Sequence, residues 1–243
     1  RAGGDWALLE ASTGRRWTFR ELFAETDRRP SREQNIVFPR GNSPEFVFAV
    51  LSAWRDGRVV FPIEAGQAES TPPLPPQPCL HLKATSATTG RPRLVAFTGP
   101  QLIADTDQIV TTMGLRPEWP NLGVISMAHS YGFSNLVLPL LLRGIPLVLA
   151  PSALPEAVRA AATDLPALTL PAVPAMWKAW HDVRAIPSSI QLAISAAAPL
   201  PISLEQAIFE RHGLKVHNFY GSTECGGIAY DAEALPRTDA TCA

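Results

Sequence analysis

The sequence predicts an α/β fold built from layered, doubly wound, mostly parallel sheets with helices on both faces. Three observations carry this prediction. Short apolar runs typical of buried strands alternate with longer stretches whose apolar residues recur at helical spacing. Turn and cap residues separate these runs. At 243 residues, the chain is long enough to bury a sizeable core.

The first predicted segment comprises residues 1–70. Thr18, with Glu21 three positions later, is typical of a helix-capping box. Pro44 stands just inside the start of a second helix, and Gly57 ends it. In order, the expected elements are strands at 6–9 and 17–19, a helix to about Arg28, a strand at 36–38, a helix from Pro44, and a strand at 59–63.

A proline-rich connector is predicted at residues 71–78. Proline supplies no backbone donor and clashes inside a helix, so this run fits neither a helix nor a central strand. We expect an extended, semi-rigid link. The alternative is a ligand for a proline-binding partner domain.

The second predicted segment comprises residues 79–231, followed by a tail at 232–243. Its strand–helix–strand repeats predict one doubly wound α/β unit from about residue 80. The expected strands are 80–84, 94–97, 122–126, 146–149, 167–170, 192–195 and, as the last clear strand, 216–219. The expected helices are 101–113, an apolar helix ending at 142, 155–162, 173–180, and 204–212 capped by Ser203 and ended by Gly213.

Composition limits the possible function classes. The 21 basic and 22 acidic residues nearly cancel, so no nucleic-acid partner is expected. The longest apolar run, residues 136–142, is far below the ~20 residues of a membrane span. The start of the chain shows no secretory signal. Three cysteines without paired spacing fit a reducing compartment, and a cytoplasmic protein is expected.

Residues 85–93 form the most distinctive loop, between two predicted strands. Hydroxyls, backbone N–H groups and a glycine can surround phosphate oxygens. Ordinary turn chemistry is the alternative, and the common Gly-Lys-Ser/Thr phosphate loop is absent. Three further loops, at 127–132, 195–199 and 220–224, also follow predicted strands. We expect all four at one sheet edge, where α/β folds bind ligands.

These loops carry a family resemblance. Residues 85–93 resemble the Ser/Thr/Gly-rich phosphate loop of the adenylate-forming (AMP-binding) enzymes. Residues 218–224 resemble the family's second hallmark, an aromatic-Gly-x-Thr-Glu motif, and residues 195–200 are similar to its adenine-lining segment. The chain is identified as the N-terminal portion of a member from the acyl- and aryl-CoA synthetase branch.

The resemblance implies roles for individual residues. The nucleotide-binding set comprises Thr85, Ser86, Thr88, Thr89 and Gly90 around the β- and γ-phosphates, and Ala197, Ala198, Pro199, Tyr220, Gly221 and Ser222 around the adenine side. Thr223 would donate to the α-phosphate, and Glu224 would hold Mg²⁺. Arg91 or Arg93 would offset the charge of the leaving pyrophosphate, and Arg93 is the expected catalytic residue of the two.

The implied reaction is attack of a carboxylate on the α-phosphorus of ATP, which gives an acyl-adenylate and pyrophosphate. A CoA or carrier-protein thiol would then accept the acyl group. His129 resembles a histidine of the CoA-ligase branch, and no acidic residue lies between 127 and 142. A fatty or aromatic acid without an ammonium group is therefore expected. The expected substrate-binding residues are His129, Tyr131, Ser195 and Asn218; a merely packed histidine is the alternative for His129.

The sequence also departs from the family pattern. Ala87 and Ala196 replace glycines, which puts a Cβ at positions where a positive φ is expected. Arg93 replaces the usual lysine. The ribose-binding aspartate, the hinge and the C-terminal domain with its catalytic lysine have no counterpart after Glu224. We therefore expect a truncated or compact member; the alternative is a non-catalytic module that retains the ATP and acid pocket.

Overall fold

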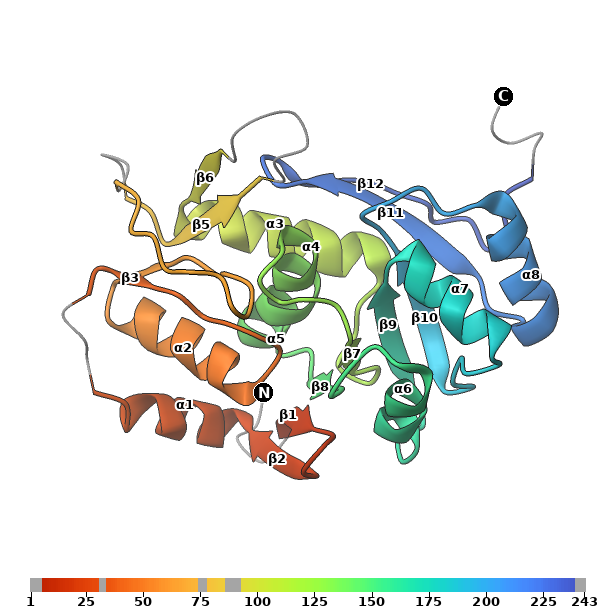
Figure 1. The fold of residues 1–243 in the computed structure, drawn as a ribbon, viewed down its shortest axis with the longest axis horizontal. Helices are drawn as coiled ribbons and strands as arrows, with labels where there is room; N and C mark the ends of the chain where they lie inside the picture. Colours follow the sequence, from red (N-terminus) through yellow and green to blue (C-terminus); the bar gives the residue numbers. More distant parts are fainter. Residues whose placement is uncertain (1–5, 31–33, 74–77, 86–92, 239–243) are drawn as a thin grey trace.

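The computed structural model describes residues 6–30, 34–73, 78–85 and 93–238, which form two sheets and their covering helices (Figure 1). The strands are β1 (Trp6–Glu10), β2 (Arg15–Thr18), β3 (Ile36–Val37), β4 (Val59–Val60), β5 (His81–Ala84), β6 (Leu94–Phe97), β7 (Asn121–Gly123), β8 (Leu147–Leu149), β9 (Leu168–Ala172), β10 (Ile190–Ser195), β11 (Val216–Ser222) and β12 (Gly226–Tyr230). The helices are α1 (Phe19–Asp27), α2 (Pro44–Arg55), α3 (Gly99–Met113), α4 (Ser130–Gly132), the π-helix η1 (Phe133–Val137), α5 (Leu138–Arg143), α6 (Pro155–Ala162), α7 (Pro174–Asp182) and α8 (Ile202–His212).

The larger sheet has eight strands in the order β12-β11-β10-β9-β7-β8-β1-β2. Its six inner strands are parallel, and β12 and β2 close the two edges as antiparallel partners. Helices cover both faces of this sheet. Along β10, Leu192 and Ile194 pack with Met113 of α3, whereas Ala193 lies in the cluster that contains Trp177 of α7. The predicted fold class is therefore confirmed.

The smaller sheet has the order β3-β4-β5-β6, with β6 antiparallel to β5. The prediction that the chain from residue 80 onward forms one doubly wound unit is wrong for β5 and β6, because β5 pairs with β4 of the first segment. Conversely, β1 pairs with β8 and joins the larger sheet. The strands of both sheets thus come from both sides of the connector at 71–78. The division into residues 1–70, 71–78, 79–231 and 232–243 stays a prediction.

The helix ends follow local signals in most places. The Thr18 box is confirmed, since Thr18 Oγ1 accepts from Glu21 N at 3.2 Å and Thr18 N donates to Glu21 Oε2 at 2.7 Å. A second box starts α3 two residues before the predicted position, with Thr98 as the cap. The predicted Ser203 cap is wrong: α8 begins at Ile202, so Ser203 already lies inside the helix. Gly213 ends α8 in the left-handed conformation, as predicted.

Two regions differ from the expected elements. The apolar helix before residue 143 is divided into α4, the π-helix η1 and α5. The last strand, β11, continues to Ser222, and β12 follows it as a hairpin partner. Sequence reasoning missed β12 because two glycines, Gly226 and Gly227, open it and glycine is depleted in strands.

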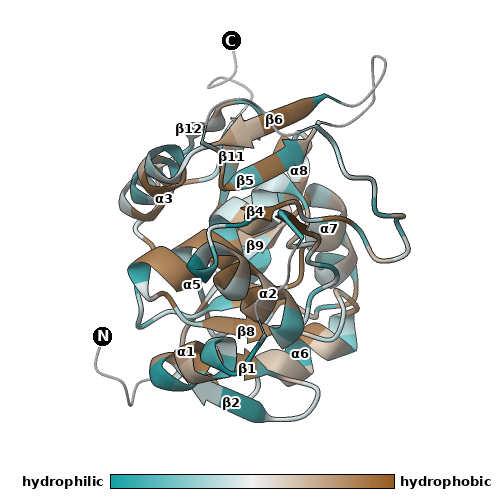
Figure 2. Cartoon of the chain, turned by 90° about the vertical axis from the view of Figure 1, so that its left-hand side faces the viewer, coloured by the Kyte–Doolittle hydropathy of each residue, from teal (hydrophilic) through white to brown (hydrophobic). Residues whose placement is uncertain are grey.

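The main apolar core joins β1, β7, β8 and β9 to α2, η1 and α5. In Figure 2 apolar colouring is concentrated on β8, α2 and α5, whereas β2 at the sheet edge is hydrophilic. Trp177 and Trp180 are fully buried and meet edge to face at 5.3 Å. Among the described residues, no helix has the length and apolar character needed to cross a bilayer.

Candidate active site

Three of the predicted substrate-binding residues lie close together at the carboxyl edge of the larger sheet. Ser195, at the end of β10, is in register with Ala172 of β9 and Asn218 of β11. Tyr131 lies over this edge, and its hydroxyl is 3.4 Å from both the Ala172 and Ile194 carbonyl oxygens. Burial raises the pKa of Tyr131 above its usual value, so the phenol stays a neutral donor.

Ser195 adds an uncommitted polar group to this edge. Its side chain is 1% exposed, and its hydroxyl has no hydrogen-bond partner among the described residues. A buried hydroxyl without a partner is unfavourable. The ring of Phe219 lies 6.1 Å from that of Tyr131 and supplies an apolar wall.

Asn218 is engaged from the other side. With its amide oxygen turned toward the Arg237 guanidinium, it accepts from Nη2 at 3.0 Å and from Nε at 3.1 Å. Arg237 also donates to Glu205 and to the Leu200 carbonyl oxygen. The chain after β12 therefore holds the predicted substrate residue Asn218 in place.

His129 directly precedes the short helix α4, makes no side-chain capping hydrogen bond, and lies on the surface with its side chain 73% exposed. Its Nε2 is 3.2 Å from Glu64 Oε1, which also accepts from Ser126 Oγ at 2.5 Å. The turn from Ser126 to α4 is compact, because a Cβ on Gly132 would come within 2.0 Å of the Ser126 carbonyl oxygen. Sequence reasoning missed Glu64, since nothing local links it to a histidine 65 positions later.

The β11–β12 hairpin carries the second family motif. Tyr220, Gly221 and Ser222 belong to β11, so the prediction that they form a loop after a strand is corrected. Tyr220 is 64% exposed. Gly221 is needed here, because a Cβ would meet the Gly226 carbonyl oxygen at 2.7 Å.

The turn of this hairpin contains Thr223 and Glu224. Ser222 Oγ accepts from the Cys225 amide at 3.2 Å and closes the turn. Glu224 is exposed, and the described residues contain no group of three or more potential metal ligands. A single exposed carboxylate suits Mg²⁺, which usually binds through one or two carboxylates together with substrate phosphates.

The segment after β10 presents Ala197, Ala198 and Pro199 on the surface. Ala197 has φ +69°, in the left-handed region that favours glycine. From the sequence, we expected a positive φ at Ala196. Ala196 is buried, and the residue with the positive φ is Ala197 instead.

The ends of the predicted phosphate loop are tied together. Thr85 N donates to Arg93 O at 2.9 Å, and Thr85 Oγ1 accepts from Arg93 N at 3.0 Å. The remaining predicted residues of this loop, Ser86, Ala87, Thr88, Thr89 and Gly90, lie outside the described residues. The loop leaves β5 of the smaller sheet, so the prediction that it shares one sheet edge with residues 220–224 is wrong.

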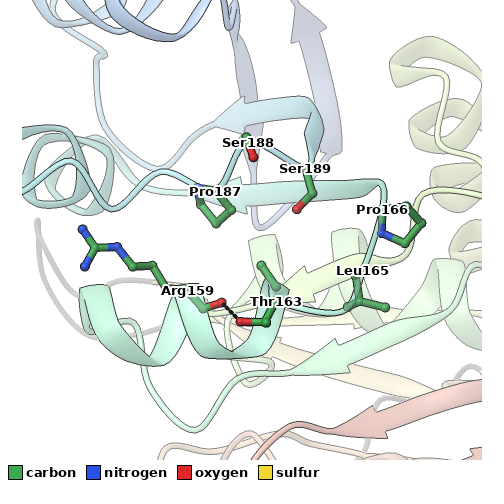
Figure 3. A pocket seen from close by; sticks show the side chains of 8 residues that line it. Arg159, Thr163, Leu165, Pro166, Pro187, Ser188 and Ser189 are labelled. Carbon is green, nitrogen blue, oxygen red and sulfur yellow. Dashed lines mark hydrogen bonds between the residues drawn. The ribbon is translucent and has the colours of Figure 1, made fainter.

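A pocket of about 430 Å³ lies elsewhere, before β9 and β10. Figure 3 shows Arg159 and Thr163 facing Pro187, Ser188 and Ser189 across it. These residues flank the amino ends of the strands, opposite to the edge that carries Ser195. The Arg159 guanidinium already donates to carbonyl oxygens of the α7–β10 connection and to a glutamate of its own helix. This pocket is therefore separate from the candidate site.

Comparison with known proteins gives one family. The family model for AMP-binding enzymes matches residues 67–242. The acyl-CoA ligase AFT1-1 of Alternaria alternata is 30% identical over 185 residues, which cover 70% of this chain and 30% of the relative.

Solved structures show the same fold. ATP-bound MatB from Rhodopseudomonas palustris superposes with a TM-score of 0.80 at 16% identity, over 97% of this chain and 61% of that one. O-succinylbenzoate coenzyme A synthetase from Bacillus subtilis, in complex with AMP, superposes with a TM-score of 0.77 at 18% identity, over 93% and 72% of the two chains. This chain thus spans under a third of the curated relative and about three fifths of MatB.

Proposed function

The chain belongs to the AMP-binding enzyme family, and on that premise we propose that it activates a carboxylic acid as an acyl-adenylate at the expense of ATP. The observation that carries this proposal is the β11–β12 hairpin. In this hairpin Tyr220 is exposed. Thr223 and Glu224 lie in the turn after β11, the strand that pairs with β10 beside Ser195. A nucleotide and an acid could therefore meet at one edge of the larger sheet.

In the proposed reaction, a carboxylate oxygen of the acid attacks the α-phosphorus of ATP. The bond from that phosphorus to the bridging oxygen breaks, and the electron pair leaves with pyrophosphate. Thr223 would donate to the α-phosphate, and Arg93 would offset the charge of the departing pyrophosphate. Glu224 would hold Mg²⁺, which neutralises phosphate charge when bound. Positioning and charge neutralisation are the main contributions that such residues make.

The chemistry of the acid side supports a fatty or aromatic substrate. Tyr131 and Phe219 present rings there, and Ser195 offers a hydroxyl. The nearby Glu64 carboxylate already contacts the His129 ring and accepts a hydrogen bond from Ser126. A substrate ammonium group would have to compete for it, which disfavours amino acids.

A thiol acceptor completes the proposal. The curated relative is named an acyl-CoA ligase, and one matched structure is a malonyl-CoA ligase with methylmalonyl-CoA and AMP bound. We propose coenzyme A or a carrier-protein thiol for this chain as part of an acid–thiol ligase whose lid and catalytic lysine lie outside it. We also propose a cytoplasmic location, which the free thiols of Cys79 and Cys225 support.

A non-catalytic module that binds ATP and an acid is the second candidate. The Asn218 amide is held by Arg237, which leaves it less available to a substrate. Such a chain would bind both ligands and turn neither over.

Exchange of labelled pyrophosphate into ATP separates the two candidates. The assay uses a panel of fatty, benzoic and cinnamic acids with the unmodified chain, with Glu224→Ala, and with Glu233→Ala as a control at another exposed carboxylate. We expect acid-dependent exchange that falls about 100-fold in Glu224→Ala alone. No exchange with any acid of the panel, while ATP still binds, would support the non-catalytic module. Undiminished exchange in Glu224→Ala would remove Glu224 from the mechanism.

A further inference from the structure

Lys83 is a buried lysine at the base of the predicted phosphate loop. It lies on β5, two residues before Thr85, and is 5% exposed. Its Nζ donates to Ser134 Oγ at 3.2 Å and lies 4.8 Å from the centre of the Phe97 ring. Burial lowers the pKa of Lys83, and the opposite charge of Asp105 acts against that shift. A lysine at this depth is unfavourable unless its ammonium group is paired.

The pairing continues beyond Ser134. The Ser134 hydroxyl, on the π-helix η1, donates to Asp105 Oδ2 at 2.8 Å. Asp105 lies on α3, and its other oxygen, Oδ1, accepts from the Gly227 amide at 3.1 Å. The polar contacts therefore run without a break from β5 through η1 and α3 to β12.

Gly226 is shaped to receive this carboxylate. A Cβ at position 226 would lie 2.2 Å from Asp105 Oδ1, and the residue has φ +73°. Glycine alone combines that close approach with that backbone conformation at little cost. The close contact between Gly226 and Asp105 is thus a second sign, besides the hydrogen bond to Gly227, that the hairpin packs against Asp105.

The two ends of the network belong to different sheets. β5 is in the smaller sheet and β12 is in the larger one, so no backbone ladder connects them. Figure 1 shows that α3 follows β6 and runs alongside the β11–β12 hairpin, which it contacts through β12. The contacts of Lys83, Ser134 and Asp105 therefore join the two predicted ATP-binding segments across this boundary, beside the apolar packing of α3 on the hairpin.

We propose that Lys83, Ser134 and Asp105 are positioning residues that fix the base of the 85–93 loop relative to the turn at Thr223 and Glu224. The purpose that we assign to this network rests on the proposed function. The network would set the spacing between the site for the terminal phosphates of ATP and the site for its α-phosphate. The network does not contact the reacting atoms and acts through the backbone at each end. Its geometry can be tested whether or not the chain binds ATP.

Hydrogen exchange at single amides tests the coupling. The variants are Lys83→Met, Asp105→Ala and the conservative Asp105→Asn. Matched controls are Asp107→Asn on the same helix, where the carboxylate pairs with Arg143 on the surface, and Lys178→Met, where the exposed ammonium pairs with Asp182. All are measured in the full chain at equal pH.

We expect Asp105→Ala to speed exchange at the Gly227 amide about 10-fold, since it removes a hydrogen bond to a charged group. Asp105→Asn should restore most of the protection, because its amide can accept from Gly227 and donate to Ser134. Lys83→Met should also speed exchange at Gly227 while global stability is kept, because methionine fills the same apolar site. The control variants should match the unmodified chain. Unchanged exchange at Gly227 in Lys83→Met would overturn the proposal.

Calorimetric titration with ATP and Mg²⁺ tests the purpose of the network. We expect Asp105→Ala to weaken ATP binding about 10-fold, and Asp105→Asn to bind nearly as tightly as the unmodified chain. Faster exchange at Gly227 without weaker ATP binding would overturn the positioning role. Failure of the unmodified chain to bind ATP would contradict the proposed function instead, and the exchange data would then decide the coupling alone.

Discussion

The Arg237 guanidinium donates from Nε to Glu205 Oε2 at 2.7 Å, and the Glu205 side chain is completely buried. Lys215 donates to the other carboxylate oxygen of Glu205 and, at 2.7 Å, to Asp231. Arg237 also reaches the Leu200 carbonyl oxygen at 2.8 Å. This cluster fastens residues 231–237 to α8, to β11 and to the end of the segment that carries Ala197 and Pro199.

Glu205→Gln should lower the free energy of unfolding by about 3–5 kcal/mol, because it removes the buried charge that Lys215 and Arg237 share and leaves Asp231 as the remaining partner of Lys215. Urea unfolding measures this as a lower midpoint at an unchanged slope. Glu210→Gln, at an exposed position on the same helix, should change stability by less than about 0.5 kcal/mol. Equal midpoints for the two variants would show that the cluster contributes nothing specific.

Gly132→Ala should destabilise the protein by about 1–3 kcal/mol, since its Cβ would overlap the Ser126 carbonyl oxygen and the backbone would have to move. The displaced turn carries His129, so the KM for the acid should rise more than the KM for ATP. Gly99→Ala is the control, because its Cβ would meet only the flexible end of Leu80 at 3.2 Å. A Gly132→Ala protein with unchanged stability and acid KM would contradict the packing described for this turn.

His81 should make folding stability depend on pH between about 6.5 and 5. The ring is fully buried, stacks on Phe133 at 4.0 Å, and has no hydrogen-bond partner for either nitrogen among the described residues. Burial holds the pKa of His81 well below its usual value of 6.5, and the neighbouring Lys83 charge lowers it further. Below pH 6.5, His81 is protonated in the unfolded chain but stays neutral in the folded chain. The free energy of unfolding therefore falls as the pH drops below 6.5.

His81→Leu should remove this loss. Between pH 6.5 and 5, the variant should keep about 1–2 kcal/mol that the unmodified chain gives up. At pH 7 its stability should be no lower, because leucine leaves no unpaired polar atom in the core. Urea unfolding across the pH range measures the difference. His181 and His212, whose pKa values burial also lowers, contribute equally to both proteins. Parallel curves would contradict the assignment to His81.

Local features of the fold could be predicted from the sequence because their causes lie within a few residues. The Thr18–Glu21 box and the Gly213 terminus are examples. The partners of a strand depend instead on contacts between distant residues. For that reason β5 was expected in the larger sheet, although it pairs with β4.

The candidate site shows the same division. The motifs at Tyr220 and Ser195 were recognisable, and β10 and β11 place them on neighbouring strands. Glu64, Arg237 and the Lys83–Asp105 network could not be foreseen, because each acts across long sequence separations on residues without a motif of their own.

Transfer of a heavy oxygen from the acid to AMP tests the central claim most directly. The chain is incubated with ATP, Mg²⁺, hydroxylamine and an acid labelled with oxygen-18 in its carboxyl group, and the AMP is analysed by mass spectrometry. If the carboxylate attacks the α-phosphorus, hydroxylamine takes the acyl group and one labelled oxygen stays in AMP. We expect labelled AMP that depends on the acid and is lost in Glu224→Ala. Unlabelled AMP, or no AMP while ATP is bound, would contradict acyl-adenylate formation by this chain.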